Sequence, residues 1–499
     1  MNQQPRKEFK DWVWLALLSI AALLVQGYHP FVEDAEIYLP GVEKLLNPRL
    51  FPVGNEFFQS HAHMTLFPNL VALSLRVTHL PFETGLLLWH FASILLLLRA
   101  CWELARLLFV TASARWTAVC MITGLLTIPV SGTALYIMDQ YLNPRNLAAF
   151  AAIFAVARVL EKRYVRAGLW ILFAGCMHPL MWVFPFSFCA LWIVLEKFDQ
   201  MRGAGTTRVR NGAVLTMGLL WKWPMAAPQT SPAYHAAAKL HANHYIQNWT
   251  WYELLGIIGP IVILWWLARI AQARQWVLLA RACRTFVIYE VVYFLLAVVI
   301  DLPARFESLA RIQPLRSLHL LYVFFFLVLG GFIGEYILKA RVWRGLVLFV
   351  PLIVGMYTAQ RALFPASAHI EWPGLTPKNA WAQAFVWIRQ NTPLDAVFAL
   401  DPEYMQLPGE DEIGFRCLAQ RSRLADDTKD NGVVSMFPRL ADKWAKQIEA
   451  QTPWKSFQAA DFAGLRTNYG VTWVVLQQPG ITGIDCPYQN QALRVCRVN

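Results

Sequence analysis

The sequence predicts a multi-pass α-helical membrane protein with a small α/β domain at its C-terminal end. Of its 499 residues, 57% are hydrophobic and only 15% are charged, whereas a soluble protein carries about 25% charged residues. Apolar runs recur throughout residues 1–360, and many approach the roughly 20 residues that a helix needs to cross a bilayer. In residues 361–499 short apolar runs alternate with helical patterns, which is typical of an α/β domain.

The first apolar run, residues 12–25, follows three basic residues near the N-terminus. No small-residue cleavage site follows this run, so we interpret it as a transmembrane helix and not as a signal peptide. Basic residues favour the cytoplasmic side, which places the N-terminus in the cytoplasm and residues 28–84 in an outer loop. Within this loop the apolar run 64–77 is too short for a comfortable span, and we expect an interfacial or half-inserted helix there.

The remaining apolar runs give the later spans. The run 167–195 contains His178 followed by a proline, and the residue before a proline avoids the helical region, so two short helices are expected to meet there. With this division every cytoplasmic loop is basic, and the sequence predicts about 11 spans with the tail outside. The other runs are residues 86–110, 117–137, 147–160, 213–223, 251–267, 285–300, 318–338 and 345–356.

The formal net charge of +12 lies entirely in the membrane part. Residues 361–499 contain 14 Lys and Arg against 14 Asp and Glu and are neutral. The excess in residues 1–360 is concentrated in loops between spans, where the positive-inside rule predicts it. No basic stretch interleaved with aromatic residues is present, so the charge does not indicate a nucleic-acid partner.

The tail, residues 361–499, is predicted to form a partly parallel sheet with helices between its strands. The strands are expected at 396–400, 470–477 and 493–498, and the helices at 381–393 and 435–450. Cys486 and Cys496 can form a disulfide if the tail is extracytoplasmic, since disulfides persist in oxidising compartments.

An acidic pair, Glu33 and Asp34, opens the outer loop shortly after the first span. A carboxylate at the membrane surface can act as a general base on a substrate held at the lipid boundary. Adjacent side chains rarely converge on one proton, so we assign the base to Asp34 and a supporting role to Glu33. The alternative is a solvated loop whose acids cap a helix that begins near Ala35.

Basic residues on the expected outer side are candidates for holding a lipid phosphate, which arginine can grip with two hydrogen bonds. The alternative is that they anchor helices by snorkelling into the headgroups. His241 and His244 share one helical face, where metal ligation and interfacial hydrogen bonding are both open. The basic candidates are Arg145, Lys239, Arg305, Arg311 and Arg316.

Several functional classes lack their signatures. The sequence contains no phosphate-cradling glycine loop, no nucleophile elbow and no HExxH pattern, which argues against an ATP-driven pump or a metalloprotease of those types. Charged residues within the spans are too few for an ion-coupled transporter.

Several stretches of the chain resemble the GT-C superfamily of integral-membrane glycosyltransferases, and more closely a group of bacterial GT-C-like proteins. These stretches are HPFVEDAEIYLPGVEKLLNPRLF, MDQYLNPRN, the MHPLM turn and the tail segments WIRQNTPLDAVFALDPE and FRCLAQRSRLADDTKD. The resemblance covers nearly the whole chain. It implies a bacterial plasma-membrane protein with a cytoplasmic N-terminus and an extracytoplasmic tail.

The resemblance also implies a chemistry. In GT-C enzymes the first outer loop supplies an acid that activates the acceptor hydroxyl, and Asp34 holds the matching position beside Glu33. The donor is usually a sugar on a polyprenyl phosphate or diphosphate held by an outer arginine, here Arg305, Arg311 or Arg316. Some members bind Mg²⁺ or Mn²⁺ at this loop, although no second acidic motif in this sequence clearly completes such a site.

Two functions are therefore expected from the sequence. The first is an inverting transfer of a hexosyl or pentosyl unit to a glycan, lipid or protein acceptor, as in polysaccharide biosynthesis of the cell envelope. The second is a non-catalytic lipid or polysaccharide transporter or assembly scaffold, which would use the same basic outer cavity without needing a base.

Overall fold

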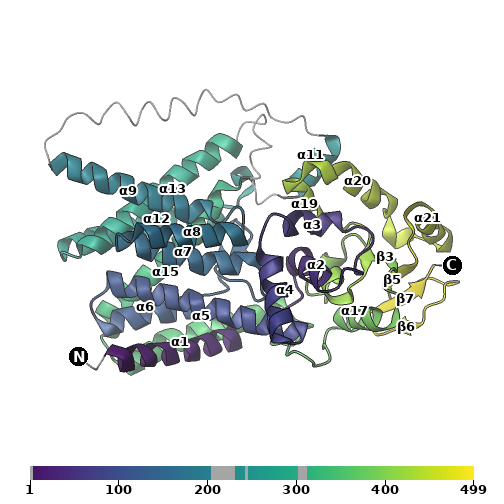
Figure 1. Ribbon diagram of the computed structural model, residues 1–499, viewed down its shortest axis with the longest axis horizontal. Coiled ribbons are helices and arrows are strands. Elements are labelled where there is room, and N and C mark those ends of the chain that lie inside the picture. The colour runs from purple at the N-terminus through teal and green to yellow at the C-terminus, as the bar shows by residue number, and fades with distance from the viewer. Residues whose placement is uncertain (1–3, 204–230, 242–244, 302–311, 499) are drawn as a thin grey trace.

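The computed structural model describes residues 4–203, 231–241, 245–301 and 312–498. A helical bundle forms one end of the molecule and the tail forms the other, with the N-terminus at the far end of the bundle (Figure 1). The bundle consists of α1 (Gln4–Gln26), α5 (Phe82–Leu108), α6 (Ala112–Gly124), α7 (Pro144–Leu160), α8 (Tyr164–Met177), α9 (Val183–Gly203), α12 (Trp251–Ala273), α13 (Val277–Asp301), α15 (Ser317–Ile333) and α16 (Val342–Leu363).

Five described helices are long and apolar enough to cross a membrane, so the prediction of about 11 spans is not supported. Not every apolar run forms a span, because several runs are divided into shorter elements. The run 117–137, for example, leaves the helix at Gly124 and continues into the hairpin of β1 (Pro129–Val130) and β2 (Leu135–Tyr136). The predicted span 213–223 lies outside the described residues. The five helices are Phe82–Leu108, Trp251–Ala273, Val277–Asp301, Pro314–Leu338 and Val342–Leu363.

The helix break predicted at His178 is confirmed, since α8 ends at Met177 and α9 begins at Val183. The apolar run 64–77 forms α4 (Phe67–Thr78). A helix of 12 residues is about 18 Å long, shorter than the roughly 30 Å hydrocarbon core of a bilayer. This length fits the interfacial helix that the sequence predicted.

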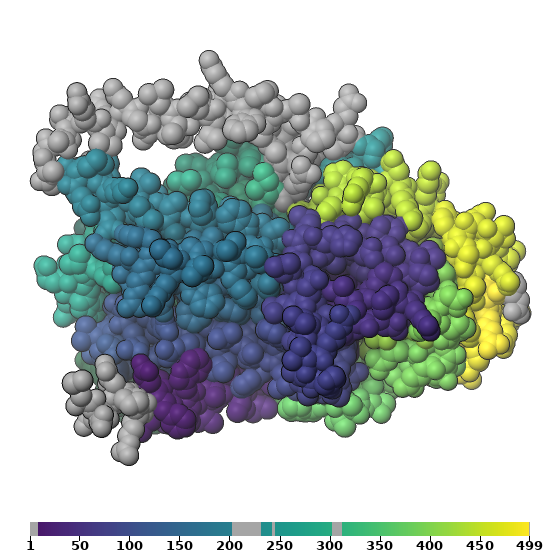
Figure 2. Space-filling model, in the orientation of Figure 1, coloured from purple at the N-terminus to yellow at the C-terminus, as the bar shows by residue number. Residues whose placement is uncertain are grey.

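The segment that follows α1 packs against the tail. Gly27 ends α1 with a φ of +83°, and a Cβ at this position would lie 2.7 Å from the carbonyl oxygen of His369, so only glycine fits. The chain then pairs with the tail through the bridges Tyr28–Ile370 and Val32–Ile413. Figure 2 shows this purple to dark-blue segment between the bundle and the green and yellow tail. Its helices are α2 (Ala35–Leu46), α3 (Glu56–Ala62) and α4.

The tail contains the predicted mixed sheet, in the strand order β4-β3-β5-β7-β6. The first three strands pair in parallel and the last two add in antiparallel fashion. The three predicted strands are confirmed as β3 (Val397–Ala399), β5 (Trp473–Gln477) and β7 (Leu493–Arg497), and the structure adds β4 (Ser422–Arg423) and β6 (Tyr488–Gln489).

The tail helices follow the prediction at one place and depart from it at another. The first predicted helix is confirmed as α17 (Ala380–Asn391). The single helix predicted over 435–450 is wrong, because Pro438 interrupts it and separates α19 (Asp430–Met436) from α20 (Ala441–Ala450). The remaining helices are α11 (Pro232–Leu240), which packs on the tail, α18 (Phe415–Ala419) and α21 (Ala459–Tyr469).

Cys486 and Cys496 form a disulfide that joins β7 to the loop before β6. Replacing both with serine is expected to lower the free energy of unfolding of this sheet edge by about 3 kcal/mol, because the bridge closes a short loop in the unfolded chain. Hydrogen exchange of β5 and β7, read by mass spectrometry, measures the change. Cys120→Ser in α6 is the control, and unchanged exchange in the double variant would contradict the prediction.

Candidate functional site

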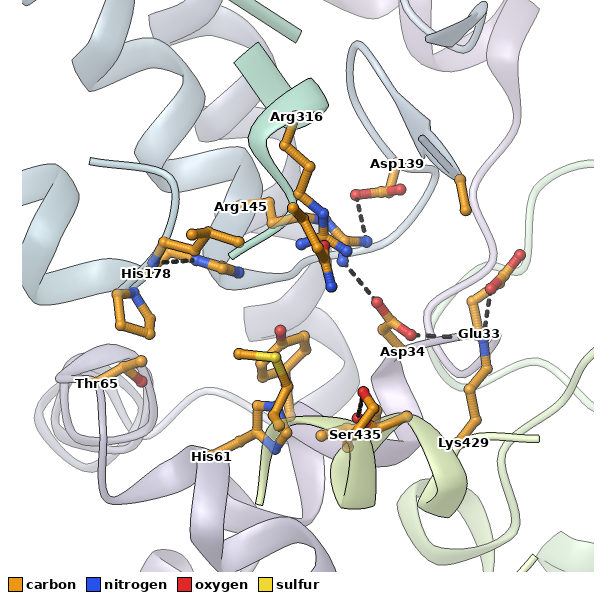
Figure 3. Close-up of a pocket in the computed structure, with 18 of the residues that line it drawn as sticks. Glu33, Asp34, His61, Thr65, Asp139, Arg145, His178, Arg316, Lys429 and Ser435 are labelled. Atoms are coloured by element: carbon orange, nitrogen blue, oxygen red, sulfur yellow. Dashed lines mark hydrogen bonds and ion pairs between the residues drawn. The ribbon is translucent and has the colours of Figure 1, made fainter. Parts of the chain in front are cut away.

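A cavity of about 220 Å³ lies where the bundle, the first outer segment and the tail meet. Carboxylates, guanidinium groups and imidazoles from the bundle and the first outer segment face it, together with the ammonium group of Lys429 from the tail (Figure 3). The polar and aromatic side chains that line it include Glu33, Asp34, Tyr38, His61, Tyr136, Asp139, Tyr141, Arg145, His178, His241, Arg316, Lys429 and Ser435.

Asp34 immediately precedes α2, but its side chain does not cap this helix. Its carboxylate accepts a hydrogen bond of 2.6 Å from Nη1 of Arg145 and lies 3.4 Å from Nζ of Lys429 (Figure 3). The side chain remains 24% exposed and lines the cavity. The alternative that Asp34 caps the helix is therefore wrong. Arg145 and Lys429 hold its carboxylate at the cavity wall, where it can contact a bound ligand.

Glu33 adopts a φ of +57°, a conformation that non-glycine residues rarely take. The tail holds it there, since the backbone N–H of Glu33 donates to the carbonyl oxygen of Glu412 and the carboxylate accepts a 2.6 Å bond from Lys429. Backbone strain of this kind costs on the order of 1 kcal/mol or more and is concentrated at functional sites.

Arg145 lies in the first turn of α7, where Asn143 caps the helix by accepting from the backbone N–H of Asn146. One guanidinium nitrogen binds Asp34, and the other binds Asp139 at 3.2 Å. Asp139 also accepts a hydrogen bond from the side chain of Asn143. Asp139 was not predicted from the sequence. Its position six residues before Arg145, in the same stretch MDQYLNPRN, could have indicated it.

Lys429 is the residue of the tail that brings a positive charge to this cavity. It was not predicted from the sequence. Its partner Glu33 lies 396 positions away, so no local pattern connects the two. Burial alone would lower the pKa of Lys429, but the negative charges of Glu33 and Asp34 outweigh burial and raise this pKa well above its usual range. Lys429 is therefore a permanent cation.

A buried ion cluster holds Lys429 beside Asp34. Glu36, two residues after Asp34, accepts a 2.9 Å hydrogen bond from Arg423 of the tail. Arg416, which is 2% exposed, contacts both Glu36 and Asp430, the residue after Lys429. Removing one partner of such a buried cluster is costly, so it fixes α2 against the tail.

Arg316 reaches the cavity from a short 3₁₀ turn, Pro314–Arg316, at the start of α15 (Figure 3). Within the described ranges its Nε is buried without a hydrogen-bond partner, and no carboxylate there forms an ion pair with it. Arg316 is thus the cation best placed to bind an incoming anion.

His178 occupies the break between α8 and α9 and lines the cavity. Its Nδ1 accepts from the backbone N–H groups of Leu180 and Met181, which leaves Nε2 to carry the proton. Burial, together with the positive charges of Arg316 and Arg145, lowers the pKa of His178 well below its usual value. His178 is therefore a neutral hydrogen-bond donor.

Nearby charges lower the pKa of the adjacent cavity acids Glu33 and Asp34 and raise that of Glu412, which does not line the cavity but contacts Glu33. Burial would raise the pKa of Asp34, but Lys429 and Arg145 outweigh it and hold this pKa well below its usual range. Burial is likewise outweighed at Glu33, whose pKa is lowered mainly by Lys429. At Glu412, burial and the negative charge of Glu33 raise the pKa to about 8.

The structure brings together five of the residues predicted from the sequence and separates one. Lys239 lies on α11 with its side chain exposed and does not line the cavity, because α11 turns its buried side toward α19 and α20. Arg305, Arg311 and His244 lie outside the described residues. The five that line the cavity are Glu33, Asp34, Arg145, His241 and Arg316.

The donor set does not fit a divalent metal ion. In the described part of the chain, no group of three His, Cys, Asp or Glu side chains is arranged to hold a metal. Asp34 and Asp139 are both engaged by Arg145, and Glu33 is engaged by Lys429. A Mg²⁺ or Mn²⁺ ion would have to displace cations from every carboxylate around it.

An apolar groove of about 650 Å³ lies beside the cavity, between α8 and α9. Its lining includes Gly168, Ile171, Cys176, Trp182 and Phe186. Cys176 and Trp182 flank the turn whose residues 178–180 line the cavity, so the groove and the cavity adjoin the same helix break.

Comparison of the sequence with models of protein families, and with curated proteins, finds no match.

Proposed function

We propose that this protein is an inverting membrane glycosyltransferase, which moves a sugar from a polyprenyl-phosphate donor to a hydroxyl group at the outer face of a bacterial plasma membrane. One observation carries the proposal: the partly exposed carboxylate of Asp34 faces a cavity together with three cations. The cations are Arg145, Arg316 and Lys429. A transfer reaction of this kind needs a base for the acceptor and positive charge for the leaving phosphate.

The reaction assigns each group a task. The acceptor oxygen attacks the anomeric carbon while the bond from that carbon to the phosphate oxygen breaks, and the electron pair leaves with the phosphate. Asp34 takes the acceptor proton. Arg316, whose Nε has no protein partner among the described residues, binds the phosphate as its negative charge grows, and the Nε2–H of His178 is a further donor.

The ion pairs of Asp34 account for a rise in its basicity when the donor binds. In the free protein Arg145 and Lys429 keep the pKa of Asp34 low, which makes it a poor proton acceptor. An incoming phosphate attracts the same two cations. Their release from Asp34 raises its pKa toward the range of a useful base, so the base becomes active when the donor is in place.

Two further features support this function. The apolar groove between α8 and α9 offers a surface for the polyprenyl chain of a donor whose phosphate lies in the cavity. The disulfide between Cys486 and Cys496 suits an oxidising compartment outside the cytoplasm. In this proposal the cavity and the tail lie on the outer side, with membrane lipids around the bundle.

Purified protein incubated with a panel of radiolabelled polyprenyl-phosphate sugars tests the proposal. Transfer to an acceptor, or release of the sugar to water, is the expected result. Saturable binding without turnover, across the whole panel, would replace the enzyme with the alternative function, a lipid or polysaccharide transporter or assembly scaffold.

Lys429→Met is expected to move the acid side of the pH–rate profile upward by roughly 1–3 units. In the wild type the pKa of Asp34 is depressed, so this carboxylate stays ionised as the pH falls well below neutral. Without Lys429 burial is opposed mainly by Arg145, so the pKa of Asp34 rises and this carboxylate takes up its proton at higher pH. The measurement is kcat/KM of both proteins between pH 3 and pH 8, where the activity of the variant should begin to fall at a higher pH than that of the wild type. The exposed Lys443→Met is the control, and superimposable profiles for Lys429→Met and wild type would contradict the assignment.

A further inference from the structure

We propose that a second cavity, of about 490 Å³, is a binding site for a neutral sugar unit. It lies on the other side of the first outer segment from Asp34: Tyr28 and residues 30–32 line it, whereas residues 33 and 34 line the first cavity. The loop 370–378 and one face of α17 form its other walls. The site does not depend on the transferase reaction.

The size and charge of this cavity restrict the ligand. Its volume falls within the roughly 300–1,000 Å³ that is common for small-molecule sites. Two acids, Glu83 and Glu371, and two bases, Lys378 and Arg389, line it, so the walls are neutral overall. Neutral walls give no net attraction for a phosphate or a polyamine and favour an uncharged ligand with many hydroxyl groups.

An aromatic platform and hydrogen-bonding groups meet in the same walls. Trp372 lines the cavity and is 46% exposed, which leaves a ring face open for the C–H face of a sugar. Glu371, next to it, is fixed by its backbone N–H, which donates to the carbonyl oxygen of Tyr28 at 3.0 Å. Arg389 is held by Glu83 at 3.4 Å and presents donors to the cavity.

Tyr28 supplies an independent observation. Its side chain is fully buried, yet its hydroxyl has no hydrogen-bond partner among the described residues. Buried hydroxyl groups are nearly always paired, because an unpaired one keeps the full cost of losing water. Tyr28 forms part of the wall of the second cavity, and its hydroxyl is buried behind that wall. A ligand hydroxyl completes the missing bond when the side chain turns toward the cavity on binding.

Binding to protein in phospholipid nanodiscs tests the proposal, because the headgroup of a maltoside detergent is itself a sugar. The probes are the neutral trisaccharides maltotriose, cellotriose and mannotriose, followed by saturation-transfer NMR. At least one is expected to bind saturably, and Trp372→Ala is expected to weaken binding at least tenfold. Trp343→Ala, on the exposed face of α16, is the matched control.

Tyr28→Phe is the sharper variant, because it removes only an unpaired hydroxyl. Its thermal unfolding midpoint is expected to equal or exceed that of the wild type, while trisaccharide binding weakens about tenfold. Tyr252→Phe, at an exposed position on α12, is the control for this change. Asp34→Asn should bind the trisaccharide as wild type does, which separates this site from the proposed reaction.

Three results would overturn the proposal. The first is that none of the trisaccharides binds saturably to the wild type. The second is that Trp372→Ala and Tyr28→Phe bind as the wild type does. The third is that inorganic phosphate or spermine competes with the trisaccharide at this cavity, which would mean that its walls select a charged ligand.

Discussion

Asp34→Asn is expected to reduce sugar transfer at least about 100-fold, the usual contribution of a general base. Asparagine keeps the size of the side chain but cannot accept the acceptor's proton. The loss should lie in kcat, while KM for the donor stays the same or falls. Arg145 and Lys429, which bind Asp34 in the free protein, would then be free to bind the donor phosphate.

Glu33→Gln is the matched control for this experiment. Glu33 carries the same charge on the neighbouring residue, but its carboxylate contacts Lys429 and not Arg145. We expect less than a tenfold loss, in keeping with a supporting role. Thermal unfolding of both variants shows whether each has folded. Equal turnover by Asp34→Asn and wild type would keep the enzyme class and remove Asp34 as its base.

Arg316→Met is expected to lower kcat by about 100- to 1,000-fold, the effect of removing one preorganised donor from a developing negative charge. The substitution breaks no ion pair with an acid in the described residues, and the Nε of Arg316 is buried without a partner there. Stability should therefore stay unchanged or rise. Stopped assays at saturating donor, together with unfolding midpoints, measure the two effects.

Two variants sharpen the interpretation of Arg316→Met. Arg316→Lys keeps a positive charge but loses the two-pronged grip on phosphate, so its activity should fall between those of wild type and Arg316→Met. Arg439→Met removes an exposed arginine of the tail and should leave kcat unchanged. If Arg316→Met and Arg439→Met had the same small effect, Arg316 would not be the phosphate ligand.

The span count shows where local sequence patterns fall short. Hydropathy identified the long apolar helices, such as α12 and α15, because a continuous apolar run needs no knowledge of its neighbours. It failed at residues 117–137, where one apolar run is divided between α6 and a partly buried hairpin. An apolar segment has the same hydropathy whether protein or lipid surrounds it. Only the packing therefore distinguishes a segment of the protein core from a membrane span.

The residues of the candidate site also fall into two groups: those that the sequence indicated and those that only the packed fold brings to the cavity. The sequence indicated Asp34 through its place after the first helix, and it indicated Arg145 and Arg316 through their charge at the expected outer ends of helices. It did not indicate Asp139 or Lys429. Nothing local distinguishes a lysine in the tail from any other exposed lysine until the ion cluster at Glu36 brings it against Asp34.

By itself the sequence determined the properties that contiguous residues carry: apolar helices, the break at His178, the strands of the tail and an acidic pair after the first helix. The tertiary structure decided which charges meet. Asp34 faces Arg145 and Lys429, and Arg316 lines the same cavity without an acid of its own in the described chain. Helix and strand patterns depend on neighbours along the chain, whereas an ion pair depends on distances that only the packed fold sets.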